Sequence, residues 1–243
     1  MDVVNANLLV CEDARAASRE AAERFVCAAI RGVAKYGVFH VAIPGGSSPR
    51  GMFELLAGGE FRELVPWTRT ELFFTDERCV PPEHEDSNYR LAFDLLISTV
   101  PIPEPNVHRM RGEDEPKSAA ALYEAELHRV MGSSPRFGLI ILGMGADTHT
   151  ASLFPGTPAL LETGKHVAAN YVQKLGAHRL TLTLPVISHA EQVIVVAFGQ
   201  DKAQALADAL TGPEDANLHP VQAVRPASGR LLWIVDREAA SKL

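Results

Sequence analysis

The sequence predicts an α/β protein with a doubly wound, mostly parallel sheet and helices on both faces, a Rossmann-like architecture. Short aliphatic runs alternate along the chain with longer segments whose apolar residues recur at helical spacing, which is the pattern of consecutive βαβ units. Glycine-rich or charged turns follow several of the aliphatic runs. Ligands of such sheets bind beyond the carboxyl ends of the strands, so we look for function in these turns.

The composition is that of a globular protein and excludes several functional classes. The 243 residues are 47% hydrophobic and 22% charged, and without a linker or repeat they predict a single domain over residues 1–243. The net charge of −7 argues against a nucleic-acid partner. Three cysteines without CxxC spacing, and no apolar run of membrane-spanning length, predict a cytoplasmic protein with no membrane partner.

The first βα unit ends in a turn suited to an anion. A helix over Glu12–Lys35 precedes a strand over Val38–Ile43, which runs into Pro44–Pro49. Its two glycines allow close approach of a ligand to the backbone, and we expect Ser48 to cap a helix that begins at Pro49. Backbone N–H groups there could bind an anion, although an ordinary βα turn has the same composition. The residues concerned are Gly45, Gly46, Ser47 and Ser48.

Charged residues follow the next strand, Thr70–Thr75. Asp76 and Arg78 come directly after it, where the strand end meets the crevice. The guanidinium of Arg78 could bind a phosphate or carboxylate, or it could pair with Glu77 or Asp76 on a solvated loop. Further helices are predicted from Ser87 and over Pro116–Val130.

The most informative stretch is the strand Leu139–Leu142 and the loop Gly143–Pro155 that follows it. The strand is uncharged, as expected for one buried on both faces. Its loop carries a carboxylate, Asp147, two residues before an imidazole, His149. The alternative is that Asp147 only caps a turn and His149 is a solvated loop residue.

The remaining elements bring further cations to the same edge. Lys202 precedes a helix over Ala203–Leu210, a position unfavourable for a cation unless an anion is nearby. Arg179 could lie close to it. The convergence of these charged and glycine-rich turns predicts a site for an anionic small molecule. The remaining predicted strands are His166–Tyr171, His178–Leu184, Gln192–Phe198 and Arg230–Val235.

These motifs, taken together and in order, resemble the 6-phosphogluconolactonase family, which is related to the glucosamine-6-phosphate isomerases. The resemblance covers nearly the whole chain, and His149–Pro155 looks like the lactonase branch. One position departs from the family pattern, because Thr148 stands where the family usually has glycine. The motifs are Pro44–Pro49, Thr75–Arg78, Asp86–Tyr89, Gly143–Pro155, His178–Thr181 and Gly199–Ala203.

The resemblance implies hydrolysis of 6-phospho-D-glucono-1,5-lactone to 6-phospho-D-gluconate, in the oxidative pentose phosphate pathway. A neutral histidine can take a proton from water and return it to the departing ring oxygen, and this role is assigned to His149. Asp147 would hold the imidazole or a sugar hydroxyl, and Asp76 would contact sugar hydroxyls. The substrate phosphate would bind the Gly46–Ser48 turn together with Arg78, Arg179 and Lys202.

Two other functions fit the same residues. In an aldose–ketose isomerase or deaminase, Asp76 and His149 would move protons between adjacent carbons. A non-catalytic sugar-phosphate sensor would need the cations but not the base. No metal is expected, since no set of residues has ligand spacing, and no nicotinamide cofactor, since Gly143-Met-Gly145 lacks the third glycine of a dinucleotide fingerprint. We expect a monomer or small homo-oligomer whose partner is the small-molecule substrate.

Overall fold

The computed structural model describes residues 7–227 and 229–243, and its centre is a seven-stranded parallel sheet. The strands lie in the order β1-β10-β9-β6-β2-β3-β5. The prediction of a doubly wound, mostly parallel sheet is confirmed. The bounds are β1 (Asn7–Cys11), β2 (Phe39–Ile43), β3 (Thr70–Phe74), β5 (Val107–His108), β6 (Leu139–Gly143), β9 (Gln192–Ala197) and β10 (Arg230–Asp236).

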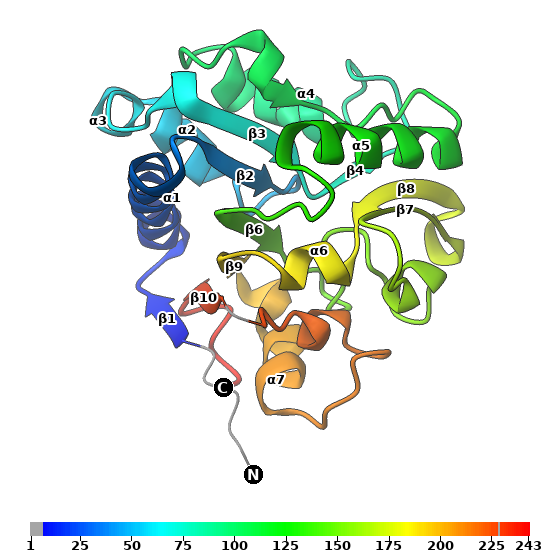
Figure 1. The fold of residues 1–243 in the computed structure, drawn as a ribbon. Coiled ribbons are helices and arrows are strands. Elements are labelled where there is room, and N and C mark those ends of the chain that lie inside the picture. Colours follow the sequence, from blue (N-terminus) through cyan, green and yellow to red (C-terminus); the bar gives the residue numbers. More distant parts are fainter. Residues whose placement is uncertain (1–6, 228) are drawn as a thin grey trace.

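Helices cover both faces of this sheet (Figure 1). Adjacent residues of β6 point to opposite faces: Ile141 packs with α1 and α2, and Ile140 with α5 and α7. Continuous aliphatic strands therefore follow from burial on two sides. The helices are α1 (Ala14–Tyr36), α2 (Arg50–Ala57), α3 (Gly59–Arg62), α4 (Asn88–Ala92), α5 (Pro116–Met131), α6 (Leu184–Ser188) and α7 (Ala203–Thr211). Short 3₁₀ segments span Trp67–Arg69, Glu104–Asn106, Pro158–Leu161, Gln173–Leu175, Gln200–Lys202 and Pro220–Ala223, and a π-helical turn spans Phe93–Ile97.

A second, antiparallel sheet of three strands lies beyond the end of β3. It consists of β4 (Asp76–Arg78), β8 (Ala177–Leu182) and β7 (Val167–Val172). The sequence predicted β7 and β8 as strands, but the alternative of a solvated loop at residues 76–78 is wrong. Those residues are a strand whose first two side chains are buried.

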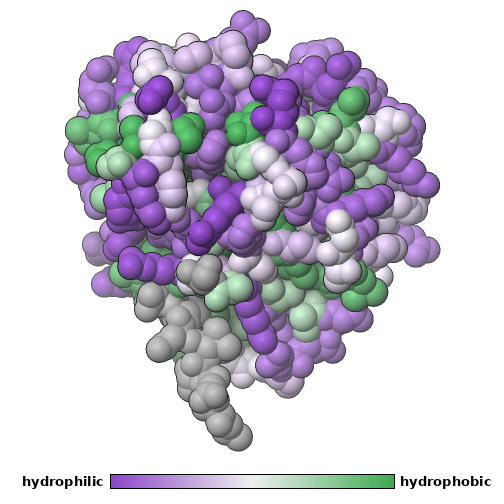
Figure 2. Space-filling model, viewed as in Figure 1, coloured by the Kyte–Doolittle hydropathy of each residue, from purple (hydrophilic) through white to green (hydrophobic). Residues whose placement is uncertain are grey.

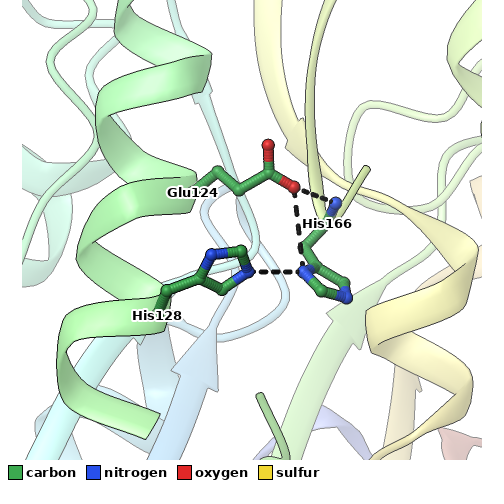
Figure 3. Close-up of side chains that lie close together, drawn as sticks. All are labelled: Glu124, His128 and His166. Carbon is green, nitrogen blue, oxygen red and sulfur yellow. Dashed lines mark hydrogen bonds and ion pairs between the residues drawn. The ribbon is translucent and has the colours of Figure 1, made fainter. Parts of the chain in front are cut away.

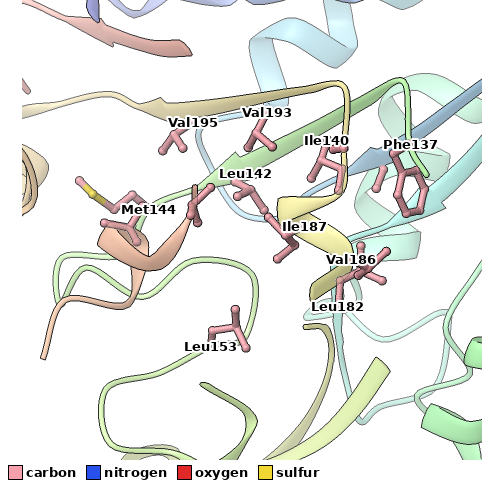
Figure 4. Close-up of a cluster of buried hydrophobic side chains, with 14 of the residues drawn as sticks. Phe137, Ile140, Leu142, Met144, Leu153, Leu182, Val186, Ile187, Val193 and Val195 are labelled. Atoms are coloured by element: carbon pink, nitrogen blue, oxygen red, sulfur yellow. The ribbon is translucent and has the colours of Figure 1, made fainter. Parts of the chain in front are cut away.

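The second sheet shares the hydrophobic core on one face of the parallel sheet. Leu182 of β8 and Leu153 of the loop after β6 join the cluster that contains Ile140 and Leu142 (Figure 4). The loop that carries His149 is thus anchored by its own buried leucine. On the face drawn in Figure 2, hydrophilic residues predominate and hydrophobic residues form small, separate groups.

The direction of winding reverses between β2 and β6. From β2 the chain adds β3 and β5 on one side, and from β6 it adds β9 and β10 on the other. The loops after β2 and β6 therefore lead in opposite directions and leave a crevice between them. Doubly wound proteins bind ligands in such a crevice. The turns singled out in the sequence follow β2, β3, β6 and β9, four neighbouring strands.

Candidate active site

His149 is held by three neighbours that leave one ring nitrogen available. Its Nδ1 lies 2.5 Å from Oδ1 of Asp147, and its ring stacks on Phe154 with centroids 4.0 Å apart. Gly145 lies so close that a Cβ on it would be 2.1 Å from Nδ1 of His149. No hydrogen bond to Nε2 is formed within residues 7–227 and 229–243. The side chain is 29% exposed, so it is not the solvated loop residue of the alternative interpretation.

Asp147 is an anion that orients the imidazole. Its Oδ2 accepts a hydrogen bond from Nζ of Lys174 at 2.8 Å. The hydrogen bond with His149, and then that with Lys174, hold the pKa of Asp147 far below its usual range. A carboxylate that stays ionised stabilises an imidazolium and fixes the proton on Nδ1 of the neutral ring. Its backbone-capping contact, His149 N to Oδ1, is long at 3.4 Å.

Thr148 adopts the left-handed conformation that the family glycine would favour. Its φ is +63°, which is costly for a β-branched residue. The buried hydroxyl donates to the carbonyl of Asp147 at 2.6 Å, and the Thr148 carbonyl accepts from the backbone N of Val221 at 3.1 Å. These hydrogen bonds help to offset the cost of the left-handed conformation.

Asp76 is buried at the start of β4 and is held from two sides. Its Oδ2 accepts from Oγ of Ser152 at 2.8 Å, and its Oδ1 accepts from Oγ1 of Thr75 at 3.1 Å. Ser152 belongs to the His149 loop, and its backbone N donates to Oγ1 of Thr181 on β8 at 3.1 Å. This serine therefore ties the His149 loop, which follows β6, to two strands of the antiparallel sheet.

Asn88 lines the cavity and carries a buried oxygen without a partner among the described residues. Its Nδ2 donates to the carbonyl of Asp76 at 2.9 Å, which fixes the amide orientation. Its Oδ1 is buried and has no partner among the described residues. A Cβ on Gly45 would lie 1.7 Å from that oxygen, so only glycine fits there. An orphan buried acceptor facing a cavity is suited to a ligand hydroxyl.

Glu77 fixes this corner by accepting hydrogen bonds at the start of α4. The backbone N of Asn88 and of Tyr89 donate to its carboxylate at 2.7 and 2.8 Å, and the backbone N of Arg78 donates at 2.8 Å. Burial raises the pKa of Glu77, and these bonds act in the opposite direction. The carboxylate thus binds backbone amides and leaves the guanidinium of Arg78 to other partners.

Two arginines lie side by side on neighbouring antiparallel strands. Arg78 of β4 pairs in register with Arg179 of β8. Burial, and next the charge of Arg78, lower the pKa of Arg179. Arg78 donates to the carbonyl of Asp86. Two adjacent guanidinium groups repel each other, and a phosphate between them would relieve that repulsion.

The turn after β2 completes the anion-binding side. Gly46 has φ of +87°, a conformation open to glycine. The expectation that Ser48 caps the helix is wrong, because α2 starts at Arg50 with Pro49 at the capping position and no side-chain cap. The chain makes a further turn before the helix begins, so the Ser48 hydroxyl is not used by the helix.

Lys202 approaches from the opposite side of the crevice. It occupies the capping position of α7, as predicted, and its Nζ lies 3.1 Å from Asp201. The preceding turn is fixed by the buried carboxylate of Asp236, whose two oxygens accept from the backbone N of Gly199 at 3.0 Å each. Only 16% of the lysine side chain is exposed.

These groups surround one cavity of about 170 Å³. Two of the predicted site residues, Asp147 and Arg179, do not line this cavity. Asp147 contacts the side of the His149 ring at Nδ1, and Arg179 lies beside Arg78. The sequence does not assign a role in the site to Asn88, Ser152, Glu77, Lys174 or Phe154. Asn88 belongs to the Asp86–Tyr89 motif, but its hydrogen bond to the carbonyl of Asp76 is visible only in the fold. The predicted site residues that line the cavity are Gly45, Gly46, Ser47, Ser48, Asp76, Arg78, His149 and Lys202.

Comparison with known proteins shows which family the chain belongs to. The family model described as glucosamine-6-phosphate isomerases/6-phosphogluconolactonase matches residues 12–233. The chain belongs to this family. It is 36% identical over 218 residues to a 6-phosphogluconolactonase of a Synechocystis species, with 88% of each chain covered. It is 34% identical to a 6-phosphogluconolactonase of Streptomyces coelicolor, covering 97% of this chain and 94% of that one.

Solved structures in the family have the same fold. The 6-phosphogluconolactonase of Trypanosoma cruzi superposes with a TM-score of 0.88 at 26% identity, covering 100% of this chain and 98% of that one. A monomeric glucosamine-6-phosphate deaminase superposes with a TM-score of 0.82 at 17% identity, covering 98% and 100%. The fold alone thus serves both branches of the family, and the branch must be decided by sequence and site.

Proposed function

We propose that this protein is a 6-phosphogluconolactonase that hydrolyses 6-phospho-D-glucono-1,5-lactone to 6-phospho-D-gluconate. The observation that carries the proposal is Nε2 of His149, which has no hydrogen-bond partner among the described residues, at a cavity whose lining also includes Arg78 and Lys202. Hydrolysis of a phosphorylated ester requires a positioned base and a cationic site for the phosphate, so this pair of features supports the proposal. The curated relatives support the lactonase branch, since they are 6-phosphogluconolactonases at 34 to 36% identity.

In the proposed reaction, a water attacks the lactone carbonyl while Nε2 of His149 accepts its proton. Asp147 stabilises the imidazolium that forms. Collapse of the tetrahedral intermediate breaks the bond between the carbonyl carbon and the ring oxygen, and the imidazolium returns the proton to that oxygen. The histidine ends the cycle in its starting state.

The phosphate binds at the cationic end of the cavity. Arg78, Arg179 and Lys202 supply charge, and the Gly46–Ser48 turn supplies backbone and hydroxyl donors. Asp76 and Asn88 face the sugar between the two ends and accept hydrogen bonds from its hydroxyls. Asp76 already accepts two hydrogen bonds from the protein, so it acts as a binding group in this scheme and His149 transfers the protons.

The first test compares freshly prepared lactone with glucosamine 6-phosphate as substrates. Rapid hydrolysis of the lactone, with no deamination or isomerisation of the amino sugar, is expected. The opposite preference would assign the protein to the isomerase branch. Binding of both ligands without turnover of either would leave only a sugar-phosphate sensor.

The second test is His149→Asn, which removes the base and keeps a polar side chain. We expect kcat to fall by about 10² to 10⁴, the usual contribution of a general base, while 6-phosphogluconate binds with nearly unchanged affinity. His178→Asn, a change at an exposed histidine on β8, is the matched control. Near-wild-type turnover by His149→Asn would remove this residue from the mechanism.

A cytoplasmic location and a monomeric or small homo-oligomeric state are part of the same proposal. The thiols of Cys11, Cys27 and Cys79 are free, which suits a reducing compartment. Within the described residues, no helix has both the length and the apolar character to span a bilayer.

A further inference from the structure

A compact group of metal-ligand side chains lies apart from the cavity. Glu124 and His128 project from α5 toward His166, which immediately precedes β7 (Figure 3). Their potential ligand atoms all lie within 4.8 Å of one another. None of the three lines the cavity that contains His149, and the proposed reaction uses none of them.

The backbone holds the three residues in place without a metal. Glu124 and His128 are one helical turn apart, so they share a face of α5, and the neighbouring Tyr123 and Leu127 are buried in the core. The backbone N of His166 donates to Oε1 of Glu124 at 2.5 Å. The backbone carbonyl of His166 accepts a hydrogen bond from the backbone N of Thr183 at 3.0 Å. The donor set therefore comes from two fixed elements.

The side-chain geometry converges on a point between the residues. Nε2 of His128 lies 2.9 Å from Nδ1 of His166, and that Nδ1 lies 3.7 Å from Oε1 of Glu124. The imidazole planes are nearly perpendicular, at 83°, so the nitrogens face each other while the rings do not stack. Ligand atoms of a tetrahedral zinc site are about 3.3 to 3.6 Å apart, given bonds of about 2.0 to 2.2 Å, and the observed separations bracket this value.

We propose that Glu124, His128 and His166 bind one Zn²⁺ or a similar divalent transition metal, and so join α5 to the start of β7. Two imidazoles and a carboxylate are typical zinc ligands, and water can take a fourth position. The side chains of Glu124 and His166 are 21% and 25% exposed, so an ion can enter from solvent. The sequence predicts no metal, since no set of residues in it has ligand spacing. His166 is 38 residues away from His128 along the chain, so spacing in the sequence does not reveal this set.

The alternative is that a proton takes the place of the metal. One imidazole N–H would then donate to the other ring, and the cluster would be an ordinary surface hydrogen-bond network. Both states use the same atoms, so binding measurements on ligand variants are needed to separate them.

The test is a titration of the chelator-treated protein with Zn²⁺, followed by calorimetry and by thermal unfolding. We expect one equivalent to bind and to raise Tm, because an ion that binds only the folded state stabilises it. His128→Ala, His166→Ala and Glu124→Gln should each weaken binding at least about tenfold, and Glu124→Gln retains an oxygen acceptor for the His166 amide. Co²⁺ substitution should give visible ligand-field bands that the same variants lose.

Two control variants exclude other donors. Cys27→Ser removes an exposed thiol, and His178→Ala removes an exposed histidine on β8; both should bind Zn²⁺ as tightly as the wild type. Far-ultraviolet circular dichroism and lactone hydrolysis report whether each variant is folded. The proposal is overturned by a wild type that binds no Zn²⁺, or by unchanged affinity in folded His128→Ala and His166→Ala proteins.

Discussion

The carboxylate of Asp147 contacts both the imidazole of His149 and the amine of Lys174, so we expect a change there to affect both activity and stability. Its pKa is held far below the ordinary value of 3.8 by His149 first and Lys174 second. A lowered folded-state pKa means that the unfolded chain binds more protons in acid. The stabilisation is therefore complete above about pH 4 and is lost as the pH falls from 3.8 toward the folded-state pKa.

Asp147→Asn should accordingly lower both stability and activity at neutral pH. Hydrogen bonds to charged groups contribute about 1.5 to 3 kcal/mol, so the variant should lose roughly that free energy of unfolding at pH 7. Its kcat should fall at least about tenfold, since the imidazolium loses its counter-charge. Urea unfolding between pH 7 and pH 3 measures the first effect, and the gap from wild type should narrow below pH 4. A gap that widens in acid would contradict the sign of the shift.

Thr148 is a residue whose conformation carries a cost that its contacts offset. Thr148→Gly relieves a left-handed β-branched residue, worth about 1 to 2 kcal/mol, but it loses the hydroxyl bonds and gains unfolded-state entropy. We expect activity to stay within about tenfold of wild type, or about 1.4 kcal/mol of barrier. Thr148→Ala, which keeps the strain and loses the hydroxyl, is the comparison. Near-complete loss of activity in Thr148→Gly would show that the hydroxyl itself holds the site.

At the scale of elements, the cations that we assign to the phosphate come from different parts of the fold. Arg179 lies on β8 of the antiparallel sheet, and Lys202 caps α7 beyond β9 of the parallel sheet. Both are remote from the base in the proposed complex. Their contacts to the phosphate therefore exist equally in the ground state and the transition state.

Arg179→Ala and Lys202→Ala should raise KM more than they lower kcat, because they remove uniform binding. Arg237→Ala deletes a positive charge whose side chain is 71% exposed and should leave both constants unchanged. Steady-state kinetics with fresh lactone give the two parameters. A fall in kcat at unchanged KM in both variants would show that the cations act on the reacting carbonyl instead.

A strand could be predicted from the sequence only where its own residues form a recognisable pattern. Strands β2, β6 and β9 consist mostly of apolar residues, so their positions and the turns after them can be predicted from the sequence. Strand β4 has only the residues Asp76, Glu77 and Arg78, and no local pattern marks three charged residues as a strand. They form one because β8, about a hundred residues later, supplies the hydrogen bonds. The register that places Arg78 beside Arg179 is likewise visible only in the fold.

The site residues divide in the same way. His149, Asp76 and Lys202 could be predicted because each follows a strand that is evident in the sequence. The role of Asn88 could not be predicted from the sequence. Its unpartnered oxygen fits only because Gly45, 43 positions earlier in the chain, has no Cβ. Ser48 was misassigned as a helix cap because capping propensity is local, whereas the observed turn delays the helix to Arg50.

At the scale of the whole molecule, we propose that residues 1–243 form a single domain. The two hydrophobic clusters lie on opposite faces of the same strands, so neither can form without the sheet. Thermal unfolding followed by circular dichroism and by tryptophan fluorescence should give one coincident transition. Two separated transitions would instead indicate independent halves.

The hydrogen bonds of Ser152 lie where a bound substrate could also connect the two sheets. Near the cavity, hydrogen bonds join the antiparallel sheet to segments that follow strands of the parallel sheet. Ser152, in the loop after β6, donates to Asp76 of β4, and the backbone N of Leu182 donates to the carbonyl of Thr75, which follows β3. In the proposed complex, a sugar phosphate bound by Arg78 at one end and by the His149 loop at the other spans the same junction. It is then a temporary cross-link, so backbone amides of β4 and β8 should exchange with deuterium more slowly while it is bound and return to their faster rate when product leaves.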